Sequence, residues 1–193
     1  MGRPRSFDAD RALDRALRVF WRKGFEGATL SDLTEAVGVN RPSLYAAFGD
    51  KKALFRKVLD RYLNGPAAYT QEALKQPTAR AVAERLLRGA ADLNTSPRNP
   101  GGCLIVQGAL ACGEAADSIR QELAASRVAG ETALRRRFEQ AQSQGDLAGD
   151  TDPADLARYL ATVVYGIAVQ AAGGASKSKL QRVVEMALQA LPL

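Results

Sequence analysis

Apolar residues recur along this chain at intervals of three and four, while the alternation of period two that is typical of strands is scarce. Near the N-terminus this spacing forms one stripe on a helix predicted over residues 8–23, made of Leu13, Ala16, Leu17 and Phe20. The same spacing continues to the C-terminal residues. The pattern therefore predicts an all-α chain.

Between residues 29 and 48 the pattern predicts two short helices joined by a tight turn. Thr29 is placed to cap the first helix at the backbone N–H of Asp32, and Gly38 can adopt the left-handed backbone that ends it. Asn40 is placed to cap the second helix. Two capped helices around a glycine turn are typical of a helix-turn-helix unit.

The remaining predicted helices extend this organisation to the end of the chain. One begins at Lys51 and is closed by Gly65-Pro66, which marks a domain boundary. The others are expected over residues 78–93, 103–112, 116–144, 153–172 and 176–192.

The helix predicted over residues 153–172 is apolar on nearly its whole circumference. A helix that is apolar all round must be buried all round. In a domain this small we favour burial by a second subunit that packs on this helix and on the last one, with a central core helix in a monomer as the alternative. The residues expected at the dimer interface are Leu156, Leu160, Val163, Val164, Ile167, Val184 and Leu188.

The net charge of +6 is concentrated in the first third of the chain. Residues 1–65 carry 13 Lys and Arg against 8 Asp and Glu, whereas residues 66–193 carry 14 against 13. This is the footprint expected of a nucleic-acid-binding module joined to a nearly neutral domain. Charge alone fits a solvated basic face equally well.

Catalytic and metal-binding side chains are scarce. The chain has no histidine, which excludes Ser-His and Cys-His catalysis and histidine metal ligands. Its two cysteines cannot form a four-cysteine zinc site. We therefore expect no enzyme, no metal and no cofactor. Because no apolar run is long enough for a membrane span and no secretory signal begins the chain, we expect a cytoplasmic protein with no membrane partner.

The helix-turn-helix region resembles the TetR family of bacterial transcriptional regulators over residues 8–63. The stretch from Thr29 to Leu54, TLSDLTEAVGVNRPSLYAAFGDKKAL, follows that family's pattern almost position by position. The resemblance implies a homodimer that represses transcription from a palindromic double-stranded DNA operator and is released by a small-molecule effector. It also implies three parts, a DNA-binding domain over 1–50, a connecting helix over 51–65, and an effector-binding and dimerisation domain over 66–193.

Readout of the operator is expected at the start of the second helix of this unit. Arg41 can fork onto guanine O6 and N7, with a phosphate contact alone as the alternative. Ser43 and Tyr45 are expected at phosphates or base edges because the buried side of that helix lies elsewhere. Pro42 can touch a thymine methyl group.

Phosphate contacts are expected around this helix. Lys51 resembles the lysine that holds the operator backbone in relatives. Thr29 and Ser31 begin a helix whose N–H groups, together with the two hydroxyls, can bind phosphate. Arg3 and Arg5 form a short arm that can enter the minor groove or be disordered.

The effector pocket has no sharp motif. Helical regulatory domains usually hold an apolar cavity with few polar groups, so the candidates come from predicted apolar faces. Plain core is the alternative for each of them. They are Leu86, Leu104, Gln107, Ala111, Phe138, Tyr159, Val163 and Gly166.

Cys103 has two interpretations. It is expected at a helix N-terminus, whose dipole favours a reactive thiolate, and Gly102-Cys103-Leu104 resembles a local motif in one branch of these regulators. A repressor that senses oxidants or electrophiles through this thiol is therefore an alternative function, whereas a small buried hydrophobe is the plainer interpretation. The alternative from a different class is a helical small-molecule-binding protein that never contacts DNA.

Overall fold

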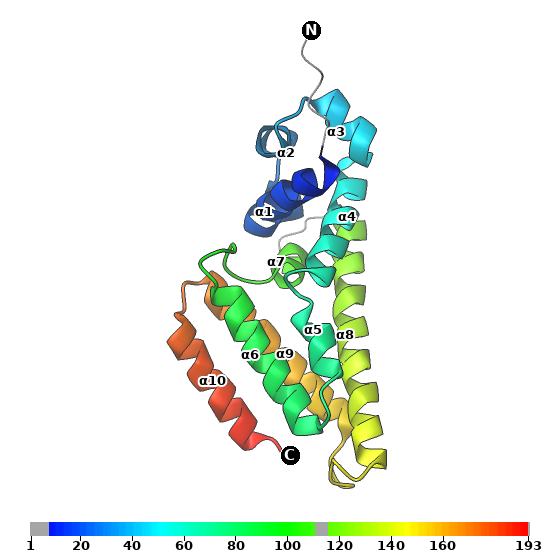
Figure 1. Cartoon of the computed structure of the whole chain (residues 1–193), viewed down its shortest axis with the longest axis vertical. Helices are drawn as coiled ribbons and strands as arrows, with labels where there is room; N and C mark the ends of the chain where they lie inside the picture. The colour runs from blue at the N-terminus through cyan, green and yellow to red at the C-terminus, as the bar shows by residue number, and fades with distance from the viewer. Residues whose placement is uncertain (1–7, 111–115, 193) are drawn as a thin grey trace.

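The computed structural model describes residues 8–110 and 116–192, and within those ranges every regular element is a helix (Figure 1). The prediction of an all-α fold is confirmed. No helix in these ranges is long and apolar enough to cross a membrane. The helices are α1 (Ala9–Gly27), α2 (Leu30–Val37), α3 (Arg41–Phe48), α4 (Lys51–Asn64), α5 (Tyr69–Leu74), α6 (Ala79–Thr95), α7 (Leu104–Leu110), α8 (Asp117–Ser143), α9 (Pro153–Ala172) and α10 (Lys177–Ala190).

The first three helices form the head of the molecule, and its caps are those that the sequence predicts. The Thr29 hydroxyl accepts from the N–H of Asp32 over 3.1 Å, and the Asp32 carboxylate accepts from the N–H of Thr29 over 2.9 Å. Lys23 pairs with the same carboxylate at 2.6 Å. The Lys23 hydrogen bond, followed by those from Thr29, lowers the pKa of Asp32 to about 2. Gly38, with a φ of 81°, ends α2 in the left-handed conformation.

An aromatic cluster holds α1 against α4. The Phe55 ring meets Phe20 edge-on at 5.1 Å and Phe25 at 5.3 Å between ring centres. Trp21 and Tyr62 form a third edge-on pair at 4.8 Å. All five side chains are buried, and edge-to-face is a preferred geometry for aromatic pairs. α4 is therefore fixed to the head as it runs down towards the other helices (Figure 1).

α7 completes the core of the head from a distant part of the chain. Leu104 is 1% exposed and belongs to the same hydrophobic cluster as α1 and α4, as do Ile119 and Leu123 near the start of α8. The Trp21 indole N–H donates to the carbonyl of Gly102 over 2.7 Å. The core of the head thus extends past the boundary predicted at Gly65-Pro66.

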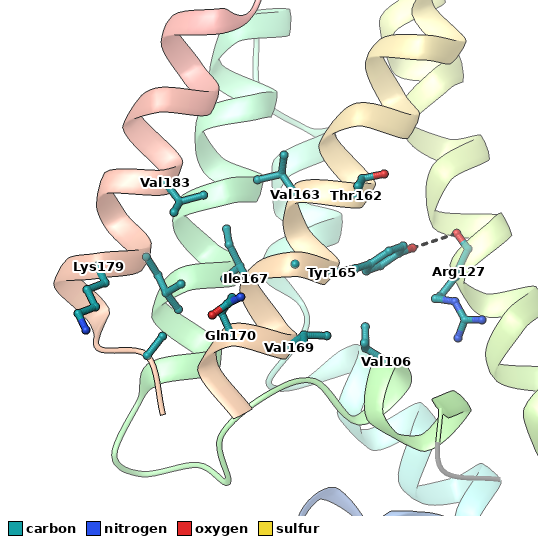
Figure 2. Close-up of a pocket in the computed structure, with 13 residues that line it drawn as sticks. Val106, Arg127, Thr162, Val163, Tyr165, Ile167, Val169, Gln170, Lys179 and Val183 are labelled. Atoms are coloured by element: carbon teal, nitrogen blue, oxygen red, sulfur yellow. Dashed lines mark hydrogen bonds between the residues drawn. The ribbon is translucent and has the colours of Figure 1, made fainter. Parts of the chain in front are cut away.

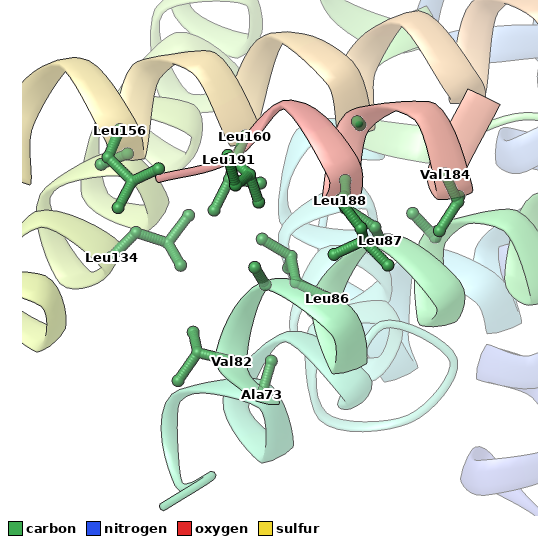
Figure 3. Packing of buried hydrophobic residues seen from close by; sticks show 14 of the residues in the cluster. Ala73, Val82, Leu86, Leu87, Leu134, Leu156, Leu160, Val184, Leu188 and Leu191 are labelled. Atoms are coloured by element: carbon green, nitrogen blue, oxygen red, sulfur yellow. The ribbon is translucent and has the colours of Figure 1, made fainter. Parts of the chain in front are cut away.

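A second core joins the C-terminal helices. α9 packs on α6 and α8, and α10 packs on α6. Figure 3 shows Leu87, Leu160, Val184 and Leu188 meeting between α6, α9 and α10. Burying one leucine fully is worth about 2 to 3 kcal/mol, so this cluster fixes the three helices relative to one another.

Two helices differ from the pattern-based prediction. α5 was not predicted, because it has six residues, no side-chain cap and only Ala73 buried, which leaves no periodic stripe. Its Tyr69 packs on α6 at Gly89, where a Cβ would overlap the tyrosine ring. α1 was predicted to end at Gly24. The helical backbone does break there, with a φ of 70° at Gly24, and a further short helical stretch after this kink extends α1 to Gly27.

Asp32→Asn is expected to destabilise the chain in a pH-dependent way. Because the folded state lowers the pKa of this carboxyl from 3.8 to about 2, the ionised group stabilises the fold above about pH 4, and this contribution is lost as the pH falls through about 2. Thermal midpoints of the variant and the unmodified chain should therefore differ at pH 7 and converge near pH 2. Glu35→Gln, an exposed position on α2, is the control for losing one carboxylate. A gap of equal size at every pH would contradict this role of Asp32.

Candidate functional site

α3 buries one side in the head and leaves its first turn open to solvent. Leu44 and Phe48 are 1% and 4% exposed. Arg41, Pro42 and Ser43 are exposed. A helix of this kind fits the major groove of B-DNA, where the N-terminal residues of a recognition helix contact base edges.

Arg41 and Tyr45 form a pair on the exposed side of α3. The guanidinium carbon of Arg41 lies 5.3 Å from the centre of the Tyr45 ring, and one of its Nη atoms donates to the tyrosine hydroxyl over 3.3 Å. Tyr45 is half-buried, so it supports the arginine from the protein side. Stacking on a ring pre-orients the planar fork that matches the two acceptors of a guanine.

The residues at the start of α2 cap the helix and also lie on the surface of the head. Thr29 uses its hydroxyl to cap the helix, whereas Ser31 is exposed. The free N–H groups of the first turn and the positive end of the helix dipole lie beside both, which suits a phosphate oxygen. Arg3 and Arg5, the predicted arm, lie outside the described residues.

The sequence predicts Lys51 as a phosphate ligand, but in the structure its ammonium also has contacts within the chain. Its ammonium lies 4.6 Å from the centre of the Phe25 ring and donates to the carbonyl of Glu26 over 3.5 Å. Burial lowers the pKa of Lys51, against a smaller raising effect of Glu26. Lys51 therefore ties α4 to the end of α1. Lys57, which the sequence reasoning missed because it lies beyond the helix-turn-helix motif, places its ammonium 5.5 Å from the centre of the Phe48 ring at the end of α3.

Two family models match this chain. The model described as bacterial regulatory proteins, tetR family, matches residues 12–58. The model described as tetracyclin repressor-like, C-terminal domain, matches residues 78–187. The chain belongs to the TetR family. It is a DNA-binding transcriptional regulator of the helix-turn-helix type.

Relatives align with this TetR-family chain over nearly its whole length. The HTH-type transcriptional repressor ComR of Escherichia coli (strain K12) is 33% identical over 193 residues, which are 99% of this chain and 92% of that protein. The repressor BdcR of the same strain is 29% identical and spans 98% of this chain and 92% of its own. A cysteine mutant of the TetR family regulator CifR, solved with 26-base-pair operator DNA, is 44% identical with a TM-score of 0.93 and covers 98% of this chain and 100% of its own.

A cavity of about 310 Å³ lies among the C-terminal helices, and we call it the inner cavity. α4 to α9 all contribute to its wall. Of the described residues predicted for the effector pocket, Leu86 lines it. Its wall also includes Leu63, Ile105, Arg127, Glu131, Leu134 and Tyr165.

A wider groove of about 820 Å³ opens between α9 and α10, and we call it the α9–α10 groove (Figure 2). Val163 and Gly166, both predicted for the effector pocket, line it. Arg127 and Tyr165 line the groove and the inner cavity alike. In Figure 2 the Tyr165 ring extends towards α8, where its hydroxyl donates to the carbonyl of Arg127 over 3.5 Å.

The other residues predicted for the effector pocket lie elsewhere. Leu104 is buried in the core of the head and Phe138 in the second core, so both fit the alternative of plain core. Gln107 lies against the Gly102 turn. Tyr159 is 41% exposed on α9, away from both hollows. Ala111 lies outside the described residues.

Most of the residues predicted for the dimer interface are buried in the core of the chain itself. Five of its side chains are 5% exposed or less within the chain itself, namely Leu156, Leu160, Ile167, Val184 and Leu188. Val163 and Val164 are half-buried. When a helix is apolar on nearly all sides, the sequence does not show which side packs in the core of the same chain. The exposed side carries Tyr159, Thr162, Gly166 and Val169 on α9, and Val183 and Met186 on α10.

Cys103 lies where the head meets the lower helices. Its sulfur accepts a hydrogen bond from the Tyr62 hydroxyl at 3.3 Å, and the half-buried side chain packs on the core of the head. Burial raises the pKa of Tyr62 well above 10, which keeps its hydroxyl a donor. These contacts fit a small structural hydrophobe and do not support the thiol-sensing alternative. Cys112 lies outside the described residues.

Arg41→Ala is expected to relax the operator preference at one base pair in each half-site and to cost about 1 to 3 kcal/mol of binding free energy. The reason is that the arginine held on Tyr45 offers two donors to one base. Titration of the variant against the operator and its single-base variants measures the effect. A uniform loss of affinity on all sequences would show that Arg41 only positions the helix.

Lys51→Ala is expected to give the contrasting result. Loss of a phosphate contact weakens binding to all sequences about equally and reduces the slope of log affinity against log salt by about one. Because Lys51 also packs on Phe25, a thermal melt must first show that the variant is folded. A changed base preference would rule out a purely electrostatic role for Lys51.

Proposed function

We propose that this chain is a homodimeric repressor that binds a palindromic operator in the cytoplasm and leaves it when a small molecule occupies the C-terminal helices. The uncovered apolar side of α9 and α10 is the observation that carries the proposal. The relatives ComR and BdcR, both named repressors, support the direction of regulation. With it we propose residues 1–50 as the DNA-binding domain, 51–65 as the connecting helix and 66–193 as the effector and dimerisation domain.

The exposed side of α9 and α10 has the chemistry of a subunit contact. Val169 is 48% exposed, Val183 43% and Met186 69%. Exposing these apolar side chains to water is unfavourable, and burial against another surface removes that free-energy cost. A Cβ added at Gly166 would meet nothing within 4 Å, which leaves room for the close approach of another helix. A two-fold dimer brings the same patch of each subunit together, so one such surface is sufficient.

Symmetry links this contact to DNA recognition. A two-fold axis through α9 and α10 relates the two α3 helices, so each presents Arg41 to one half of the site. The half-sites must then be inverted repeats whose centres lie about one helical turn, or a multiple of it, apart. Selection of bound sequences from random duplex DNA tests this directly. Recovery of single, unrepeated sites would contradict the dimeric operator complex.

Two helices connect the inner cavity to the head. Leu63 of α4 and Ile105 of α7 line it, and both helices pack on the head. A ligand that shifts either helix changes the placement of α3. Release from DNA follows only if the ligand binds more tightly to the arrangement that does not fit the operator.

Val169→Glu combined with Met186→Glu is expected to give folded monomers that lose affinity for the full operator. Both side chains are exposed, so the cores of the chain are untouched, while two carboxylates per subunit repel across a two-fold contact. Sedimentation at micromolar concentration and circular dichroism measure assembly and folding. Gln181→Glu, also exposed on α10, is the charge control and should stay dimeric. A monomeric unmodified chain, or a variant that sediments as the unmodified chain does, would refute this contact.

A further inference from the structure

Arg127 lies in the wall of the inner cavity and has no carboxylate partner among the described residues. Its guanidinium donates to the carbonyl of Ile105 over 3.5 Å, the outer limit of a hydrogen bond. Within residues 8–110 and 116–192, none of the ion pairs involves this arginine. A guanidinium has five donors, so most of its capacity is unused in the described structure.

The carboxylate nearest along α8 is committed to another arginine. Glu131, one turn after Arg127, also lines the inner cavity, but its Oε1 lies 3.2 Å from Nε of Arg158. The wall nearby is apolar, with Leu86 and Leu134 among its residues. Among the described residues, the lining therefore presents the positive charge of Arg127, without an ion-pair partner, beside apolar surface.

We propose that the inner cavity binds a small monocarboxylate with an apolar body, whose carboxylate is held by the guanidinium of Arg127. The planar fork matches a carboxylate through two parallel hydrogen bonds, and the ligand supplies the partner that the half-buried charge lacks. The volume of about 310 Å³ lies at the small end of ligand sites, which fits a molecule with one charged group. This inference rests on the proposed effector response and names its ligand class.

The same side chain links the ligand to α7. In the structure its Nη1 donates to the carbonyl of Ile105, a residue of α7 next to Leu104 in the core of the head. A carboxylate that draws the guanidinium away from this carbonyl loosens the contact between α8 and α7. The ligand thereby acts on the helix that completes the core of the head.

Hexanoate, octanoate and benzoate, each compared with its matched alcohol, are the probes for this site. Calorimetric titration of the full chain without DNA should show a best acid that binds about tenfold more tightly than its alcohol, the contribution of one charge-assisted pair. Arg127→Gln should bind that acid and its alcohol equally, and Arg127→Lys should keep part of the preference. Arg136→Gln, an exposed arginine on the same helix, should match the unmodified chain.

Three results would overturn the proposal. They are the absence of binding by every acid, equal binding of acids and alcohols by the unmodified chain, and an unchanged preference in Arg127→Gln. If Arg127→Gln shifts the monomer–dimer equilibrium and leaves acid binding intact, the arginine serves the subunit contact instead. Because the titration contains no DNA, a chain that binds operator but no acid overturns only the ligand class. A chain that prefers the acid but is not released by it overturns the effector role.

Discussion

The carbonyl of Gly102 accepts a hydrogen bond from the indole of Trp21 across 81 positions of sequence, and the arrangement of the head on the other helices depends on this junction. Gly102 has a φ of 82°, and a Cβ there would overlap the Gln107 side chain and come within 3.0 Å of the Cβ of Ala172. The turn before α7 is thus confined by α1, by α7 itself and by the end of α9. A buried carbonyl left without its donor costs about 1 to 3 kcal/mol, so the head cannot leave this turn freely.

The packing around this junction is apolar, whereas the charged contacts across it are exposed. Arg56 donates to both carboxylate oxygens of Glu122 at 2.6 to 3.1 Å, but the two side chains are 53% and 34% exposed, and surface pairs contribute little in water. The shared core therefore joins the head to α7 and α8 more strongly than this ion pair does. Successive residues of α7 have different surroundings, because Leu104 lies in the core of the head and Ile105 lines the inner cavity. A ligand bound in that cavity would contact Ile105, the residue that follows Leu104 in the core of the head.

The head was predictable from sequence because its signals are local. Thr29 and Asp32 cap each other across three positions, and Gly38 ends the helix that they begin, so a short window of sequence contains each interaction. The Arg41–Tyr45 pair follows the same logic, since residues four apart on a helix are neighbours. The inner cavity and the exposed side of α9 and α10 were not predictable in this way. α9 is apolar on nearly its whole circumference, so only its neighbours α6, α8 and α10 decide which side is core. In the sequence alone, nothing distinguishes Arg127 from an ordinary solvent-exposed arginine.

Urea unfolding of Leu104→Ala, followed by the fluorescence of Trp21, tests most directly whether the head and α7 share one core. Trp21 is the single tryptophan and lies in the same cluster as Leu104. Truncating a buried leucine costs about 2 to 5 kcal/mol, so the Trp21 transition should move to lower urea by the corresponding amount. Phe138→Ala is the control: it removes a buried side chain from the second core and shows how the Trp21 transition responds to destabilisation outside the head. A Trp21 transition that stays in place in Leu104→Ala, while circular dichroism shows other helices unfolding earlier, would contradict the shared core.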